Sequence, residues 1–387
     1  MKILAVVSTL DLKYHLGCTP AWWQLFKALH ETGNEIITVP YLGDPVESLW
    51  WRTYSNPCSF ESKTFNWYLE QREKSGVSPS KRNIFSPIID STIKHYIKPK
   101  WEKRLLKILN AEKSIDVVFF MNVPINHIFK IPSRIKKANK IPVVYYDGDM
   151  PTILPQYTVS RGFKFDCYQG ADLSEYDAFF TNSEGCIPDL EKMGAKNIQP
   201  LHYGADPELC SPLDIDKDID VFFFGYGSDF REEWMNKLIT LPSKNMPGIK
   251  FVIGGSGFKI DLGKTERIGD LSYNEWRKYA CRSKINLNIT RWSHTNIYAS
   301  STSRLFELAA FGACIVSQPY NGLEKWFDIG KEIFIVNDEK EAIDVYNNML
   351  ESEDLCREVG NLARQRVIKE HTFKHRAKQL SDIIGKL

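Results

Sequence analysis

The sequence predicts an α/β protein made of two domains, and three observations lead to this prediction. Short apolar runs alternate with amphipathic stretches from the first residues onward, as in parallel strands joined by helices. The acidic segment 214–220 interrupts this alternation, and a new apolar run follows it. The 387 residues suffice for two domains, and the hydrophobic content of 43% is that of an ordinary globular protein.

The first half begins with a β-α-β unit. We expect strands at residues 2–7 and 35–39 and a helix over 20–31. The unit lacks the G-x-G-x-x-G fingerprint, so a dinucleotide cofactor is not expected. Loops at the carboxyl ends of parallel strands line the ligand site, which makes Asp11 and His15 candidate catalytic residues. A loop histidine without any chemical role is the commoner case.

Residues 41–70 contain eight large aromatic side chains among prolines and a glycine. One interpretation is an aromatic wall that stacks on sugar rings or on an apolar acceptor. The other is an insertion over about 41–110 with its own small core, which we favour because large aromatic residues are usually buried. Helices are expected at 61–74 and 87–110 within it.

Further strands are expected at 116–121 and 141–146, and the second is followed directly by Asp147-Gly148-Asp149. A D-x-D triplet suggests a metal ion held on a nucleotide diphosphate. We discount a metal site here because the triplet belongs to the first domain, whereas the anion-binding signals all lie in the second. The family resemblance given below supports Asp147 instead as a cleft residue.

The second half is organised around a helix and a strand over residues 303–316. Its apolar residues recur at helical spacing, while Ser303, Arg304 and Glu307 share the opposite stripe. A guanidinium beside a helix N-terminus can hold a diphosphate, and a carboxylate one turn further can accept both hydroxyls of a ribose. An amphipathic helix with a solvated polar face is the alternative interpretation.

Several glycine loops and arginines accompany this helix. The segment Asp220-Val-Phe-Phe-Phe-Gly225, strand 284–289, residues 303–316 and the closing His371-Thr372-Phe373 occur in an order that resembles the CgeB-like glycosyltransferases. The resemblance is close over residues 214–387 and looser before them. The residues that we expect to bind the donor are Gly225, Tyr226, Arg231, Gly254, Leu271, Arg291, Ser303, Arg304, Glu307, Gly322 and Leu323.

The resemblance implies the GT-B fold, with two Rossmann-like domains facing across a cleft. The domains are expected at 1–205 and 214–370, and a last helix within 371–387 crosses back to the first domain. Many retaining enzymes of this fold carry two glutamates separated by seven residues. Glu307 fits the second, but Ala299 occupies the place of the first, so the retaining outcome is not carried over.

We therefore predict a glycosyltransferase that moves a sugar from a nucleoside diphosphate sugar, as co-substrate, to an unidentified acceptor without a metal or another cofactor. Arginines would stabilise the leaving diphosphate. Asp11, His15 and Asp147 are the candidate bases. A nucleotide-sugar epimerase of the same fold and a non-catalytic nucleotide- or sugar-binding module are the alternatives.

Charge and cysteine content bear on partners and location. The formal net charge of +2 gives no support for dedicated nucleic-acid binding. Residues 94–140 hold twelve Lys/Arg against three acids, which fits either a peripheral contact with an anionic membrane or a set of solvated helix faces. The eight scattered cysteines form no Cys-x-x-Cys pair, so a cytoplasmic enzyme with reduced thiols is expected.

Overall fold

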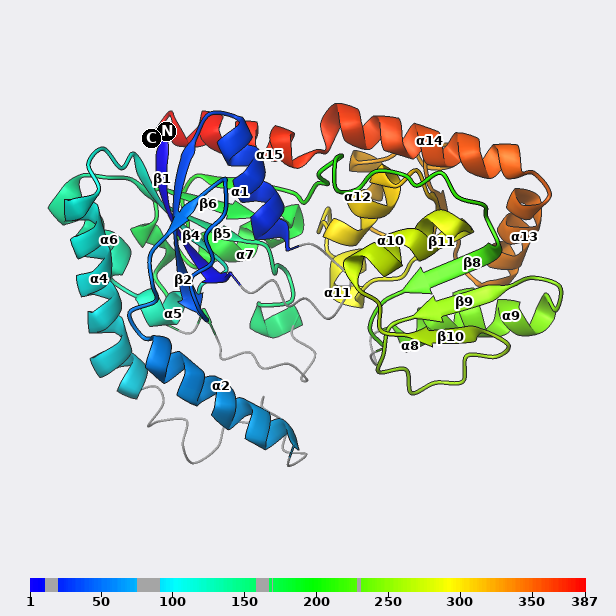
Figure 1. The fold of residues 1–387 in the computed structure, drawn as a ribbon, viewed down its shortest axis with the longest axis horizontal. Coiled ribbons are helices and arrows are strands. Elements are labelled where there is room, and N and C mark those ends of the chain that lie inside the picture. The colour runs from blue at the N-terminus through cyan, green and yellow to red at the C-terminus, as the bar shows by residue number, and fades with distance from the viewer. Residues whose placement is uncertain (11–19, 75–90, 158–166, 169, 228–230) are drawn as a thin grey trace. The chain divides into compact units, whose positions relative to one another are not determined.

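The computed structural model describes residues 1–10, 20–74, 91–157, 167–168, 170–227 and 231–387. The chain forms two compact units. The first comprises residues 1–11, 25–201 and 377–387, and the second comprises 12–24 and 202–376, as far as these are described. Figure 1 labels the strands and helices of both units.

The first unit contains a parallel sheet in the order β3-β2-β1-β4-β5-β6-β7. Its central strands are continuous apolar runs that are buried on both faces, as expected when helices cover both sides of a parallel sheet. The strands are β1 (Lys2–Thr9), β2 (Glu35–Leu42), β3 (Arg52–Thr53), β4 (Val117–Met121), β5 (Val143–Asp147), β6 (Ala178–Thr181) and β7 (Ile198–Pro200).

Helices and short helical turns connect these strands. The α-helices are α1 (Ala21–Glu31), α2 (Ser59–Lys74), α4 (Lys98–Ala111), α5 (Ile125–Ile128), α6 (Ile131–Asn139) and α7 (Ile187–Lys192). The turns are the π-helical η1 (Ile93–Ile97) and the 3-10 helices η2 (Pro155–Tyr157), η3 (Leu173–Glu175) and η4 (Glu184–Cys186). Pro99 lies in the first turn of α4, where its missing N–H costs no hydrogen bond, so it starts α4 and does not break it.

The aromatic stretch divides between the core and the surface. Tyr41 stacks on Trp101 with ring centres 5.2 Å apart, and Trp51 packs edge-on against Phe26. These rings are buried in the first unit. Phe60 and Trp67, in contrast, are exposed. The stretch therefore does not bury all of its large side chains in a core of its own.

The second unit contains a parallel sheet in the order β10-β9-β8-β11-β12-β13. Its strands are β8 (Ile219–Phe224), β9 (Phe251–Gly254), β10 (Glu266–Gly269), β11 (Ser283–Asn288), β12 (Cys314–Ser317) and β13 (Phe334–Ile335). Its helices are α8 (Glu232–Met235), η5 (Asn236–Thr240), α9 (Leu241–Asn245), α10 (Tyr273–Arg282), α11 (Trp292–Asn296), α12 (Ser303–Ala310), η6 (Leu323–Lys325), α13 (Glu339–Leu350) and α14 (Glu353–Glu370).

Alternating side chains of the second sheet build a core on each face. On β12, Ile315 joins the cluster that contains Trp276 and Phe306, whereas Cys314 and Val316 join the cluster on the other face. Helix α14 approaches α12 closely at Gly360, where an added Cβ would lie 2.1 Å from the carbonyl oxygen of Gly312. This contact fixes the helix whose polar stripe carries the predicted ligands.

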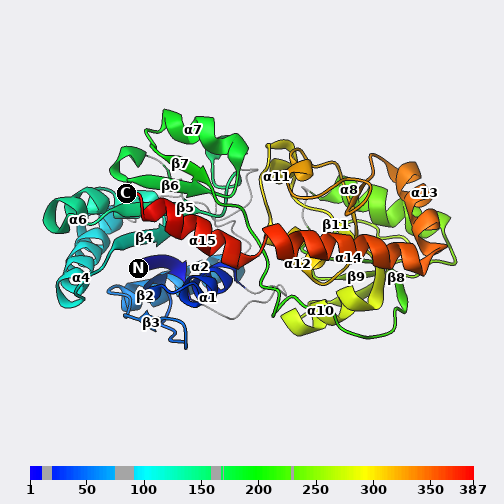
Figure 2. The same cartoon turned by 90° about the horizontal axis from the view of Figure 1, so that it is seen from above.

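The last helix, α15 (Phe373–Ile384), begins in the second unit and belongs to the first from Ala377 onward. In the first unit, Gln379 donates to the carbonyl of Pro200 at 2.8 Å, and Ser381 lies within hydrogen-bond distance of Asn34. Figure 2 shows α15 running across the first unit from above. The α/β prediction, with its two parallel sheets, is confirmed.

Candidate functional site

Three glycine loops meet at the carboxyl ends of β8, β9 and β10. The N–H of Gly225 donates to the carbonyl of Gly254 at 3.1 Å, and the N–H of Gly255 donates to that of Gly269 at 2.6 Å. A Cβ on Gly255, where φ is +109°, would lie 1.9 Å from the carbonyl oxygen of Gly225. Only glycine permits this approach, so bare backbone lines this end of the sheet.

Arg231 ties the loop after β8 to the end of β11. Its Nε donates to the carbonyl of Ile289 at 3.1 Å, and its Nη1 donates to that of Tyr226 at 2.6 Å. Burial, together with the positive charges of Arg291 and Arg304, lowers the pKa of Arg231 to about 9. Three guanidinium groups thus act on one another at the carboxyl edge of the sheet, which is an arrangement suited to an anion.

Arg304 lies on the first turn of α12, against aromatic rings. Its guanidinium carbon is 4.1 Å from the ring centre of Trp276 and 4.7 Å from that of Phe224. Its Nη1 also donates to the carbonyl of Phe224 at 3.4 Å. Trp276 is itself packed against Phe311 with ring centres 4.9 Å apart. The rings attract the cation and fix its position without neutralising its charge.

Glu307, one turn after Arg304, is fully buried. Its Oε1 accepts a hydrogen bond from Nε2 of Gln24 at 3.4 Å, while its Oε2 has no hydrogen-bond partner among the described residues. Gln24, which belongs to the second unit, also accepts from the backbone N–H of Asp206 at 2.9 Å. Burial raises the pKa of Glu307 to about 7, although the nearby Arg304 opposes the shift.

The loop after β12 packs against the segment that leads into α12. Gly322 has φ of +88°, and a Cβ there would lie 2.4 Å from the backbone nitrogen of Ala299. The N–H of Ala299 donates to the carbonyl of Asn321 at 3.0 Å. The side chain of Thr302, the N-cap residue of α12, makes no capping hydrogen bond.

The remaining predicted donor-site residues occupy the same edge. Arg291 is the exposed N-cap residue of α11, directly after the end of β11. Leu271 is buried and contacts Gly254, since a Cβ on Gly254 would lie 2.9 Å from its side chain. Leu323 is buried at the start of η6. The predicted donor-binding residues therefore lie at a carboxyl strand end, in the segments that follow such an end, or on α12.

Asp147, in the first unit, is fully buried at the end of β5. Its Oδ2 accepts from the hydroxyl of Tyr168 at 2.5 Å, and its Oδ1 accepts from the backbone N–H of Asp149 at 2.8 Å. The Asp149 side chain is exposed. The position of Asp147 in the first unit agrees with the prediction, and the catalytic role of Asp147 stays a prediction. Asp11 and His15 lie outside the described residues.

Two contacts of the site were not predicted. Trp276 lies on α10, away from any loop motif, and Gln24 lies on α1, so neither belongs to a recognisable pattern. The buried position of Trp276 follows from helical spacing, but its contact with Arg304 depends on how α10 and α12 pack on the sheet.

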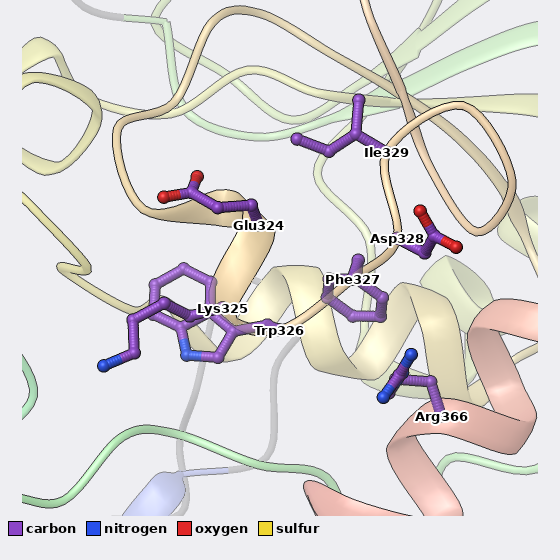
Figure 3. Close-up of a pocket in the computed structure, with 7 residues that line it drawn as sticks. All are labelled: Glu324, Lys325, Trp326, Phe327, Asp328, Ile329 and Arg366. Atoms are coloured by element: carbon purple, nitrogen blue, oxygen red, sulfur yellow. The ribbon is translucent and has the colours of Figure 1, made fainter.

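A separate pocket of about 430 Å³ lies beside η6 and α14 (Figure 3). It is lined by Glu324, Lys325, Trp326, Phe327, Asp328, Ile329 and Arg366. Arg366 is already paired with the carboxylates of Glu332 and Glu370, each at 3.1 Å. None of the predicted site residues lines this pocket, and we assign it no role.

A family model matches part of the second half of the chain. Residues 231–382 are similar to the family described as glycosyl transferase-like. The predicted enzyme class, glycosyltransferase, is confirmed at this level, whereas the CgeB-like subgroup is not. No curated protein matches the chain.

Solved structures of the same architecture cover the whole chain. A sucrose-phosphate synthase from Thermosynechococcus elongatus superposes with a TM-score of 0.66 at 12% identity, covering 100% of this chain and 99% of that one. Anabaena HepE in complex with UDP and glucose gives 0.64 at 10% identity, with both chains fully covered. A glycosyltransferase from Rickettsia africae gives 0.61 at 10%, covering 100% and 98%. These likenesses confirm the two-domain GT-B fold.

Proposed function

We propose that the chain transfers a sugar from a nucleoside diphosphate sugar to an acceptor hydroxyl. The observation that carries the proposal is the placement of Arg304 and the buried carboxylate of Glu307 on one turn of α12, with Arg231 and Arg291 at the same edge of the sheet. Anabaena HepE, which shares the fold, is described with UDP-glucose. Such a donor combines a diphosphate, which arginines can bind, with a ribose, which a carboxylate can bind.

The diphosphate would be held by Arg231, Arg291 and Arg304 together with the N-terminus of α12. Guanidinium groups bind phosphate oxygens in a bidentate manner, and helix N–H groups add donors of fixed direction. Their mutual repulsion, seen in the lowered pKa of Arg231, is relieved when an anion binds. The free protein is thus prepared for a multiply charged ligand.

The ribose would be held by Glu307. A buried carboxylate oxygen without a partner carries a desolvation penalty, which two ribose hydroxyls offset by donating to it. Gln24 orients the other oxygen. The bare glycine backbone at Gly225 and Gly254 lets the nucleoside approach the sheet edge closely.

Catalysis would then follow from the charges. The acceptor oxygen forms a bond to the anomeric carbon as the bond from that carbon to the diphosphate oxygen breaks. The arginines stabilise the negative charge that accumulates on the leaving diphosphate. The acceptor proton passes to a base, for which Asp11, His15 and Asp147 remain the candidates.

We further propose that the protein belongs to the CgeB-like subgroup, acts in the cytoplasm without a metal ion, and contacts the inner face of the membrane peripherally. The ordered motifs after residue 214 support the subgroup, and the basic stretch 94–140 supports the membrane contact. No helix in the described part of the chain is long and apolar enough to cross a bilayer.

The test is a panel of nucleoside diphosphate sugars in two assays. A thermal-shift screen identifies the donor, because a ligand that binds only the folded state raises the melting temperature. Mass spectrometry then follows nucleotide release and sugar products. We expect nucleoside diphosphate release that increases with a suitable acceptor. An epimerised sugar formed without acceptor would indicate an epimerase, and binding without turnover of any kind would indicate a binding module.

A further inference from the structure

Two helices of the first unit expose aromatic and basic side chains that the proposed reaction does not use. We call this surface the α2–α4 face. It consists of the exposed residues Phe60, Lys63 and Trp67 on α2, Tyr96 on η1, and Lys103 and Lys107 on α4, together with the half-buried Lys100.

On α2, the large aromatics lie on the solvent side of the helix. Phe60 is 79% exposed and Trp67 is 61% exposed. They are seven residues apart, so they lie on one stripe two turns from each other, with the exposed Lys63 between them. Ser62, on the opposite side, is buried. Two large rings exposed along one stripe are unusual for a helix that nothing else covers.

On η1 and α4, the exposed stripe is basic. Tyr96, Lys100, Lys103 and Lys107 follow one another at spacings of three and four residues. The buried residues of α4, Trp101, Leu105, Ile108 and Leu109, lie on its other side. Residues 93–111 carry six Lys/Arg against a single acid, Glu102, which pairs with Arg134 on α6. The cations of the stripe therefore point away from the core.

The two helices are in contact near their N-terminal ends, so the stripes belong to adjoining segments of the first unit. Glu61 of α2 pairs with Lys100 of α4, whose ammonium group lies 4.1 Å from the ring centre of Tyr96. In Figure 1, α2 extends from the lower end of α4. Lys100 and Lys63 of the face are paired with the carboxylates of Glu61 and Asp44. The net positive charge of the named residues therefore comes from Lys103 and Lys107.

We propose that the α2–α4 face binds the surface of an anionic lipid bilayer. Lysines attract the lipid headgroups, and Trp and Phe side chains insert at the boundary between headgroups and acyl chains. A soluble polyanion would satisfy the lysines but would leave Phe60 and Trp67 in water, so the bilayer fits the whole face better. The inference is independent of the transfer reaction proposed above.

The experiment is sedimentation of the full chain with vesicles of phosphatidylglycerol, phosphatidylcholine or a mixture of the two. We expect binding to rise with the phosphatidylglycerol fraction and to weaken at high salt. The variants Lys103→Glu/Lys107→Glu and Phe60→Ser/Trp67→Ser should each reduce binding at least about tenfold, since each lysine near an anionic surface contributes about a factor of five and the rings add their buried area.

Two controls use exposed residues of the second unit. Lys340→Glu/Lys369→Glu makes the same charge change, and Ile368→Ser removes an apolar side chain that is 41% exposed. Both should bind vesicles like the parent. Thermal melts verify that all variants are folded, and nucleotide binding should be unchanged in each of them. Equal binding to neutral and anionic vesicles, parent-like binding of either α2–α4 variant, or tighter binding to soluble heparin than to vesicles would overturn the proposal.

Discussion

The guanidinium of Arg304 rests on the face of Trp276, 4.1 Å from the ring centre, and this contact positions the cation at the start of α12. Trp276 is buried and cannot turn away, so Arg304 is held in place before any ligand arrives. A pre-positioned guanidinium loses little conformational entropy on binding a phosphate. We therefore expect the contact between Arg304 and Trp276 to contribute to the affinity for a phosphate, although Trp276 is itself buried beneath the guanidinium.

Arg304→Ala should weaken binding of the nucleoside diphosphate by about 1.5–3 kcal/mol, the usual contribution of a hydrogen bond to a charged group. Binding of the nucleoside alone should change little, because it lacks the diphosphate. Titration calorimetry with both ligands measures the difference. Arg357→Ala, an exposed arginine of α14, is the matched control. If the parent binds nucleoside and nucleoside diphosphate equally, the diphosphate role of Arg304 is wrong.

Glu307 should make stability depend on pH. Burial raises its pKa from 4.5 to about 7, so between these values the folded state binds a proton that the unfolded state releases. Stability therefore falls as the pH rises from about 4.5 to about 7, by roughly 3 kcal/mol for this group. Glu307→Gln should remove that loss and melt several degrees higher than the parent at pH 8, while binding nucleotide less tightly.

The control for this variant is Glu358→Gln, an exposed carboxyl of α14. It should follow the parent at every pH in thermal melts and in nucleotide titrations. A Glu307→Gln protein that binds all nucleotides as tightly as the parent would show that Glu307 is only a structural residue of α12.

Much of the fold could be predicted because the signals are local. Apolar runs at β4 and β5 and helical spacing around Glu307 define their elements without tertiary information. The edge strand β10 is not predicted from the sequence, since Glu266-Arg-Ile-Gly269 is polar and largely exposed and gives no apolar run. Its hydrogen bonds come from its neighbour β9, which no local pattern reveals.

The site was only partly predictable for the same reason. Spacing placed Arg304 and Glu307 on one stripe, but the hydrogen bond that Glu307 accepts comes from Gln24, nearly three hundred residues away. The exposure of Phe60 and Trp67 also runs against the general tendency of aromatic residues to be buried. Such features arise from packing between distant segments and cannot be obtained from periodicity.

Gly255 offers a test of the glycine loops. Gly255→Ala should destabilise the second unit by at least about 1–3 kcal/mol, because φ is +109° there and the new Cβ would clash with the carbonyl of Gly225. Nucleotide binding should fall with it. Gly248→Ala is the control, since nothing lies within 4 Å of its Cβ position and φ is not in the left-handed region. If both variants match the parent in denaturant melts, the close approach of Gly255 to the carbonyl of Gly225 is contradicted.

Asp147→Asn should abolish activity, and the hydrogen bonds now give a reason beyond proton transfer. The Asp147 carboxylate accepts from both Tyr168 and the N–H of Asp149, and an amide can accept through only one atom. Asp149→Asn, at an exposed side chain, should lose little. Tyr168→Phe separates the two roles of Asp147. An unchanged melting temperature with strongly reduced turnover supports a catalytic role, whereas a lowered melting temperature together with reduced turnover supports a structural role.

The last prediction is that activity does not need a divalent metal. A metal-dependent enzyme would hold the ion through carboxylates close to the diphosphate, but Asp147 belongs to the first unit and is engaged by Tyr168. Within the described residues, no three His, Cys, Asp or Glu side chains gather to form a metal site. The charge of the diphosphate would be met instead by Arg231, Arg291 and Arg304. Burial and the charges of Arg291 and Arg304 lower the pKa of Arg231. Turnover in EDTA should therefore equal turnover in Mg²⁺ or Mn²⁺, and salt should weaken donor binding by screening the arginines. Complete inhibition by EDTA, reversed by Mn²⁺, would reject the arginine mechanism and return the Asp147-Gly148-Asp149 triplet to consideration as a metal ligand.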